Sequence, residues 1–109
     1  MAGVRTKFAV TLFTRLNCSL CDDAKRQLSV LWEKRRFEYT EINVMEPAQE
    51  RWKRLYEFDT PVVHVDRIAK LPTTEASRKL MHRFKAAEVE ALMDEAAREA
   101  TNEASNDVD

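Results

Sequence analysis

Asn17-Cys18-Ser19-Leu20-Cys21-Asp22 is the stretch that decides the fold of this chain, because it holds the only two cysteines among the 109 residues. An apolar run of strand-forming residues, Phe8–Phe13, comes shortly before it, and a helical pattern begins within it. Two cysteines separated by two residues at a junction of strand and helix are typical of a redox-active dithiol. At this spacing the second thiol is within reach of the first and can form or resolve a disulfide.

The position of Cys18 at a predicted helix N-terminus favours its thiolate. Unpaired backbone N–H groups and the positive end of the helix dipole both face a side chain at this position. The thiolate is the form that attacks disulfides, so Cys18 and Cys21 are candidate catalytic residues. Two other interpretations are compatible with the spacing alone: a pair of small buried residues, or half of a metal site.

The rest of the chain alternates between strand and helix patterns. A helix is predicted over Cys18–Lys34, where apolar residues follow a helical stripe, and a second strand over residues 37–44. This alternation predicts an α/β fold. The remaining expected elements are a helix from about Pro47 to Tyr56, a strand over 62–65, an elaborated loop over 66–79, a short strand over 80–84 and a last helix around 89–97.

The composition indicates one ordinary domain. Of the 109 residues, 44% are apolar and 34% are charged, and no apolar run is long enough to cross a membrane. Residues 88–109 hold eight acidic residues and one basic residue, a net charge of −7, against +6 for residues 1–87. We therefore predict a domain over residues 1–100 and a disordered acidic tail over residues 101–109.

The N-terminal sequence bears on location and partners. Met1–Lys7 lacks the apolar core of a signal peptide, which predicts a cytoplasmic protein, with a nuclear location as the alternative. In a reducing compartment, cysteines at this spacing are more often catalytic or metal-binding than permanently bridged. The basic residues are scattered among acidic ones, which does not favour nucleic-acid binding. We expect a monomer with neither a membrane nor a nucleic-acid partner.

These motifs resemble those of glutaredoxins, members of the thioredoxin-fold superfamily. The resemblance extends from about Phe8 to Ala100 and implies the element order βαβ-α-ββ-α, with a four-stranded mixed sheet flanked by helices. The motifs that carry it are similar to those of the small glutaredoxin-like proteins of eukaryotes: Leu12-Phe13, Asn17-Cys18-Ser19-Leu20-Cys21-Asp22, Phe58-Asp59-Thr60-Pro61-Val62 and Met81-His82-Arg83-Phe84.

The resemblance gives each cysteine a role. Cys18 would be the nucleophile that forms a mixed disulfide with the substrate, and Cys21 would attack Cys18 and release the reduced substrate. This implies a thiol–disulfide oxidoreductase acting on a disulfide-containing protein, a glutathionylated protein or a small thiol. No bound cofactor is expected, and glutathione is a candidate reductant.

Four further residues are implied to bind substrate or glutathione: Arg15, Asn17, Thr60 and Pro61. Thr60-Pro61 would be the family's cis-proline step beside the cysteines, where the preceding backbone pairs with a bound peptide or glutathione. Arg15, three residues before Cys18, stands where glutaredoxins commonly carry a lysine, and would contact a glutathione carboxylate or the thiolate. The plainer interpretations are a strand-start proline and an exposed loop base.

The chain departs from glutaredoxins in several places. Ser19-Leu20 replaces the usual Pro-Tyr, and residues 66–79 have no counterpart in a minimal glutaredoxin. The Gly-Gly turn that holds the γ-glutamyl end of glutathione is missing, since the only glycine is Gly3, and this argues against ordinary glutathione binding. The acids Asp22 and Asp23 follow Cys21 closely, so we expect the Cys18 thiol to be less acidic than in a typical glutaredoxin.

Other classes of function are compatible with parts of the sequence. The missing Gly-Gly turn and the long loop also fit a non-catalytic protein-binding module with a weakly reactive dithiol. A zinc site made by Cys18, Cys21, His64 and His82 is disfavoured, because the spacing is not that of a zinc finger. We expect His64 to be a strand residue with a hydrogen-bonded ring and His82 to be a surface residue. A glutathione-bridged iron–sulfur cluster is disfavoured by the missing turn, so no metal site is expected.

Overall fold

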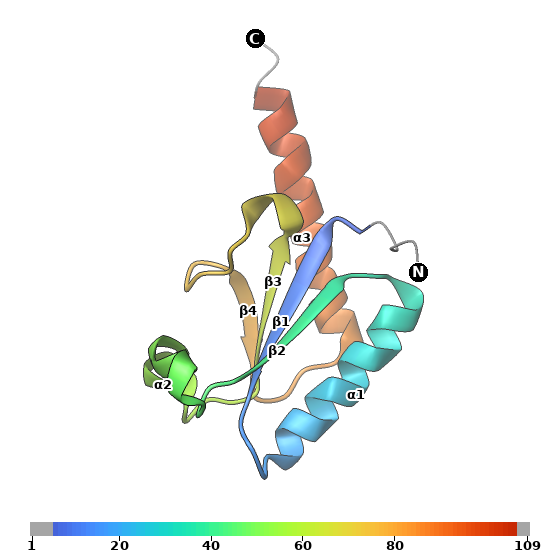
Figure 1. The fold of residues 1–109 in the computed structure, drawn as a ribbon. Coiled ribbons are helices and arrows are strands. Elements are labelled where there is room, and N and C mark those ends of the chain that lie inside the picture. Colours follow the sequence, from blue (N-terminus) through green and yellow to red (C-terminus); the bar gives the residue numbers. More distant parts are fainter. Residues whose placement is uncertain (1–5, 107–109) are drawn as a thin grey trace, which may run out of the picture.

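The computed structural model describes the chain from Thr6 to Asn106, with side chains as far as Glu103. Its sheet has the strand order β2-β1-β3-β4, in which β1 and β2 are parallel and β3 is antiparallel to both β1 and β4 (Figure 1). This confirms the predicted α/β fold with a mixed, helix-flanked sheet. The elements are β1 (Phe8–Thr14), α1 (Ser19–Lys34), β2 (Glu38–Asn43), the 3-10 helix η1 (Pro47–Gln49), α2 (Glu50–Tyr56), β3 (Val62–Arg67), the 3-10 helix η2 (Ile68–Lys70), β4 (Arg78–Met81) and α3 (Ala86–Asn106).

Strand β1 is buried along its whole length, as its apolar sequence predicts. Because side chains alternate across a strand, Val10 and Leu12 face one core and Phe13 faces the other. The first core lies between the sheet and helices α1 and α3, and the second lies between the sheet and helix α2 (Figure 1). The two cores together fix the strand that leads into the cysteines.

Helix α1 packs on the sheet through residues at helical spacing. Ala24, Leu28 and Leu31 are buried on this face, together with Cys21. The helical spacing also predicts Trp32 for this stripe, but its side chain is 37% exposed and its Nε1 donates a hydrogen bond to the carbonyl of Phe37, 3.2 Å away. Residue 32 lies one position beyond the buried Leu31, so its ring reaches only the edge of the core.

The second core is aromatic. The ring centroid of Phe13 lies 4.7 Å from that of Trp52, 5.1 Å from that of Tyr56 and 4.7 Å from that of His64. Tilted and edge-on contacts of this kind add to the free energy of simple burial. Helix α2 is only two turns long, and Trp52 and Tyr56 are its buried residues. The aromatic cluster therefore accounts for how so short a helix is held on the sheet.

His64 is a strand residue with a hydrogen-bonded ring, as the sequence predicts, and the structure adds that the imidazole is completely buried and bonded at both nitrogens. The hydroxyl of Tyr56 lies 2.7 Å from its Nε2, and the hydroxyl of Thr73 lies 2.8 Å from its Nδ1. From Thr73 the contacts continue to the Ser77 hydroxyl at 3.1 Å, which donates to Asp66 Oδ1 at 2.5 Å. These bonds satisfy polar groups that would otherwise be costly to bury.

The segment after β3 differs from the predicted loop over residues 66–79. Strand β3 continues to Arg67, η2 follows, and β4 begins at Arg78 and ends at Met81, instead of spanning residues 80–84. The register pairs Val65 with Arg78, so the strand pairing starts earlier than the hydrophobic pattern indicates. Phe84 is buried in the first core beyond the end of β4.

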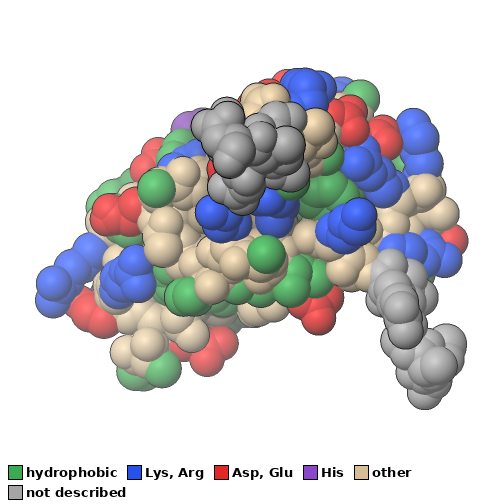
Figure 2. Space-filling view, turned by 90° about the horizontal axis from the view of Figure 1, so that it is seen from above, with side chains coloured by type: hydrophobic (Ala, Val, Ile, Leu, Met, Phe, Trp, Pro, Cys, Tyr) green, Lys and Arg blue, Asp and Glu red, His purple; other side chains and the backbone are tan. Residues whose placement is uncertain are grey.

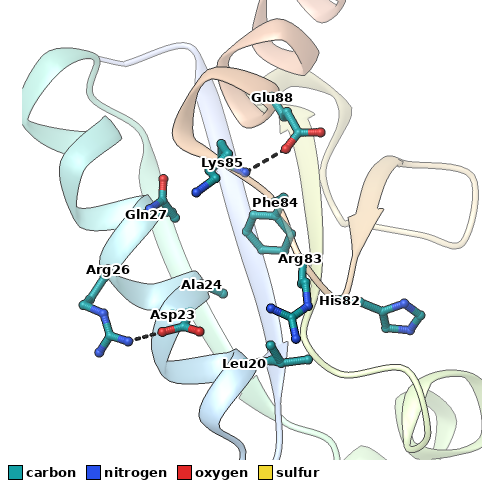
Figure 3. Close-up of a pocket in the computed structure, with 10 residues that line it drawn as sticks. All are labelled: Leu20, Asp23, Ala24, Arg26, Gln27, His82, Arg83, Phe84, Lys85 and Glu88. Atoms are coloured by element: carbon teal, nitrogen blue, oxygen red, sulfur yellow. Dashed lines mark hydrogen bonds and ion pairs between the residues drawn. The ribbon is translucent and has the colours of Figure 1, made fainter.

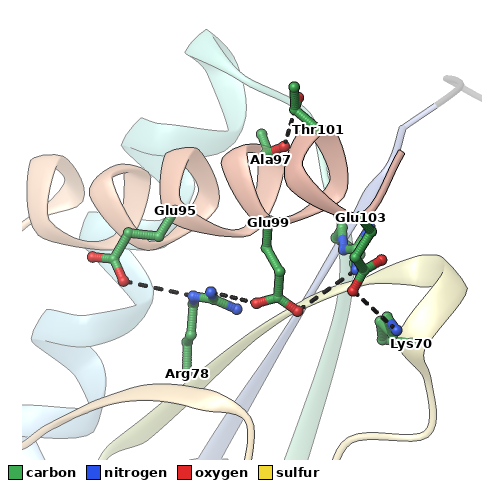
Figure 4. Close-up of polar contacts among 8 residues, drawn as sticks. Lys70, Arg78, Glu95, Ala97, Glu99, Thr101 and Glu103 are labelled. Carbon is green, nitrogen blue, oxygen red and sulfur yellow. Dashed lines mark hydrogen bonds and ion pairs between the residues drawn. The ribbon is translucent and has the colours of Figure 1, made fainter. Parts of the chain in front are cut away.

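Helix α3 continues to Asn106, whereas the composition predicts a disordered tail from Thr101 onward. Acidic side chains on this helix meet basic ones from the sheet side, as Figure 4 shows. Arg78 Nη2 lies 2.6 Å from Glu99 Oε2, and Arg67 Nη2 lies 2.9 Å from Glu103 Oε2. Ion pairs between residues far apart in the chain cannot be predicted from the local composition of residues 101–109. Residues 107–109 of the predicted tail lie outside the described residues.

The surface carries both signs of charge. On the face that Figure 2 shows, basic and acidic side chains lie among one another and do not form a single basic stripe. Within residues 6–106, no helix is both long enough and apolar enough to cross a membrane.

The burial of His64 predicts how stability depends on pH. Burial lowers the pKa of His64 from 6.5 to about 4, with the nearby charge of Lys79 acting in the same direction. Since the unfolded state binds the proton first as the pH falls, the neutral ring stabilises the fold above pH 6.5, and this stability is lost as the pH falls towards 4. The free energy of unfolding should fall by about 3 kcal/mol over this interval because of His64 alone.

Urea unfolding of the oxidised protein at several pH values measures this change, with His64→Gln as the control that lacks the titrating ring. The difference in the free energy of unfolding between the parent and the variant should shrink as the pH falls from 7.5 to 4. The series starts about one pH unit above the pKa of histidine in the unfolded chain. Unfolding free energies that change in parallel in the two proteins would show that the buried ring does not control this dependence.

Candidate active site

Cys18 is the N-cap residue of helix α1. Its backbone is extended, with φ −119° and ψ 101°, and helix α1 starts at Ser19. Its Sγ accepts a hydrogen bond from the backbone N–H of Cys21 at 3.1 Å, and its carbonyl accepts from the N–H of Asp22 at 3.2 Å. The sulfur thus occupies the place where a capping oxygen normally lies, and the N–H groups of the first turn favour negative charge on it.

The two cysteines form a disulfide, with their Cα atoms 5.2 Å apart. They differ in access, because Cys21 is only 2% exposed whereas Cys18 is half-buried. An incoming disulfide can therefore approach Cys18 from solvent, while Cys21 lies among the buried residues of helix α1. This asymmetry matches the roles of attacking and resolving thiols that the resemblance implies.

The segment before β3 lies next to the cysteine loop. The register pairs Phe13 with Val62, so the end of β1 and the start of β3 are neighbours. The Thr60–Pro61 peptide bond is cis, as the resemblance implies, and Pro61 is buried. The carbonyl of Pro61 accepts a hydrogen bond from the N–H of His82 at 2.8 Å, which brings the end of β4 to the same corner of the sheet.

Arg15 joins the cysteine loop to the end of helix α2. Its Nη1 donates a hydrogen bond to the carbonyl of Glu57 at 2.7 Å, and its side chain is half-buried. Glu57 is the C-cap residue of α2, where carbonyl oxygens lack helical partners and favour a cation. Arg15 is thus more than the exposed loop base of the plain interpretation, and its guanidinium already has a protein partner.

Asn17 acts through its backbone. Its φ is 57°, in the left-handed region that costs most residues energy but that asparagine tolerates better than others. The residue turns the chain between the end of β1 and the N-cap. An asparagine directly before a predicted N-cap is the signal that could have identified this role from sequence.

A groove of about 450 Å³ begins at Leu20, between the two cysteines, and extends along helix α1 to the start of α3 (Figure 3). Sequence reasoning missed this groove, because it joins helix α1 to residues more than fifty positions later in the chain. Its lining residues are Leu20, Asp23, Ala24, Arg26, Gln27, His82, Arg83, Phe84, Lys85 and Glu88.

The turn after β4 takes a conformation that favours glycine although it contains none. His82 has a φ of 67°, and its exposed ring lies with Nε2 3.3 Å from Asp59 Oδ1. This turn follows β4 and contains no glycine. The side chains of His82 and Arg83 line the edge of the groove at this turn.

The geometry does not bring together the four residues of the disfavoured zinc site. Both ring nitrogens of His64 are engaged by Tyr56 and Thr73, and His82 lies on the surface beside Asp59. Within residues 6–106, no three His, Cys, Asp or Glu side chains are grouped as a metal site. What the site does hold is one accessible and one buried sulfur beside a groove.

The chain is similar in sequence and fold to known proteins. A family model described as Glutaredoxin-like domain (DUF836) matches residues 9–94. The solved structure of protein Ne2328 from Nitrosomonas europaea is 25% identical, with a TM-score of 0.57, over 84% of this chain and 95% of that one.

Two thioredoxins are similar in fold alone. Thioredoxin 1 from Thermosipho africanus has a TM-score of 0.60 at 16% identity, over 85% of this chain and 98% of that one. A thioredoxin from Thermus thermophilus has a TM-score of 0.55 at 21% identity, over 81% of this chain and 72% of that one.

The left-handed backbone of Asn17 predicts opposite effects of two substitutions. Asn17→Val should lower the free energy of unfolding by about 1–2 kcal/mol, because a β-branched residue disfavours a positive φ. Asn17→Gly should leave it within about 0.5 kcal/mol, because glycine adopts this conformation without strain. Denaturant unfolding of the oxidised proteins measures both values, and equal stability of the two variants would contradict a backbone role.

Proposed function

The chain belongs to the glutaredoxin-like domain family (DUF836), and we propose that it is a thiol–disulfide oxidoreductase that uses the Cys18–Cys21 pair. The observation that carries the proposal is the placement of Cys18 as the N-cap of α1, with a backbone N–H directed at its sulfur. A structural disulfide needs no such placement, whereas a nucleophilic thiol requires stabilised negative charge on sulfur.

The reduced protein would act in two exchange steps. The Cys18 thiolate attacks one sulfur of a substrate disulfide, forming a mixed disulfide and expelling the other substrate sulfur as a thiolate. The Cys21 thiolate then attacks Cys18 Sγ and expels the second substrate thiolate. The substrate gains two electrons, and the protein is left with the Cys18–Cys21 disulfide that the structure holds.

Regeneration requires a thiol reductant. Two molecules of a monothiol such as glutathione, or one dithiol, would return the two electrons and leave as a disulfide. Burial of Cys21 directs the reductant to Cys18, the accessible sulfur. We propose that the reductant's first attack forms a mixed disulfide on Cys18, and that the second releases it.

Cysteine substitution separates the two steps. Cys18→Ser should abolish disulfide reduction, because serine cannot form the mixed disulfide. Cys21→Ser should accumulate a mixed disulfide on Cys18, which mass spectrometry of the unreduced protein detects. Parental activity in Cys18→Ser would refute the assignment of the nucleophile, and a trapped species on Cys21 in that variant would reverse the two roles.

The pH dependence of alkylation tests whether the thiol is activated. In fully reduced Cys21→Ser protein, the rate of reaction with iodoacetamide should report a Cys18 pKa below about 7, as in other active dithiol sites. Removing the neighbouring charge in Asp22→Asn should lower that pKa further, since a nearby like charge disfavours the thiolate. A value near 8.5 would argue against the enzyme and for a protein-binding module.

A further inference from the structure

The groove beside the disulfide has an apolar floor and a charged rim. Phe84 and Ala24 are buried beneath it, and Leu20 lies at its end next to the cysteines (Figure 3). Any chain attached to a sulfur in exchange with Cys18 lies close to this end. The groove is therefore placed to hold the residues that flank a substrate cysteine.

The charges on the rim are only partly neutralised. Arg26 is paired with Asp23, and the Glu88 carboxylate accepts the backbone N–H of Lys85 at 2.8 Å while keeping its negative charge. By contrast, Arg83 and Lys85 make no ion pair within residues 6–103. Figure 3 shows the Arg83 guanidinium directed from the turn after β4 towards Leu20. Of these two cations, Arg83 thus lies at the Leu20 end of the groove, next to the cysteines, and Lys85 lies towards its α3 end (Figure 3).

The loops around the cysteines suit a polypeptide. Leu16 is 77% exposed and Phe58 is 87% exposed, and their loops are joined by the Arg15–Glu57 hydrogen bond. Large apolar side chains presented to solvent beside a site are typical of protein interaction surfaces. A small thiol bound at Cys18 would leave both of these side chains uncovered, whereas a polypeptide chain is large enough to cover them.

We propose that the groove from Leu20 to Glu88 binds an acidic polypeptide segment next to the disulfide of a protein substrate, with Arg83 and Lys85 as its carboxylate partners. The inference rests on the proposed function and names the substrate class of the same site. The positive charges of Arg83 and Lys85 favour acidic residues in the bound segment. The exposed side chains of Leu16 and Phe58 favour a polypeptide over a small thiol. Arg83 and Lys85 are specificity-determining residues in this scheme.

The test uses a pair of peptides that differ only in charge. Each contains one cysteine in a mixed disulfide with 2-mercaptoethanol, flanked either by glutamates or by glutamines. The reduced full-length protein releases free peptide, which chromatography measures as a second-order rate constant at low ionic strength. Two exposed ion pairs should make the acidic peptide react about fivefold faster, and about 0.5 M salt should remove most of this preference.

Charge variants assign the preference to the groove. In Arg83→Gln/Lys85→Gln the ratio of the acidic to the neutral rate constant should fall to about one. In the matched control Lys7→Gln/Arg98→Gln, which removes the same charge from exposed sites outside the groove, the ratio should stay near the parental value of about five. Equal loss of preference in both variants would show that net charge acts instead of the groove.

The remaining outcomes overturn the inference in distinguishable ways. If the parent reduces both peptides equally, the acidic-segment inference is wrong but the proposed oxidoreductase function stands. If glutathione disulfide loses as much rate as the acidic peptide in the groove variant, the groove serves a small thiol. If neither the peptides nor glutathione disulfide react, the proposed function fails as well.

Discussion

Burial of β1 on both faces is the constraint on which the rest of the structure depends. Its side chains are shared between the core under α1 and α3 and the aromatic core under α2, so the strand cannot shift without disturbing both. The strand ends at Thr14, four residues before Cys18. Its fixed position therefore determines where helix α1 starts and where the sulfur lies relative to the neighbouring strand β3.

The site is assembled by contacts between loops. Arg15 bonds the carbonyl of Glu57, Asp59 lies beside His82, and the N–H of His82 bonds the carbonyl of Pro61. Each of these contacts is a hydrogen bond between segments more than twenty residues apart in the chain. The corner around the cysteines is thus held by its own polar contacts as well as by the cores behind it.

The sequence was sufficient where the pattern is local. The strand and helix around the cysteines, the strand position and hydrogen-bonded ring of His64, and the surface position of His82 follow from residue spacing and polarity. The sequence was insufficient where charges distant in the chain meet. Glu103 pairs with Arg67 at the end of β3, and Glu99 pairs with Arg78 at the start of β4. These ion pairs accompany the extension of α3, and no local sequence pattern predicts them. The groove was missed for the same reason, and the finer likeness to eukaryotic members of the family stays a prediction of the sequence.

The turn after β4 links the missing glycines to the question of substrate. A Gly-Gly turn would leave backbone N–H groups open to a small ligand, whereas here His82 adopts a positive φ and donates its N–H to Pro61. The side chains of His82 and Arg83 then line the space beside Leu20. Replacing backbone donors by a long cationic side chain changes what the corner can recognise, because a guanidinium reaches a carboxylate on an extended chain. This substitution is the physical basis on which we propose an acidic polypeptide, and not glutathione, as the partner of this corner.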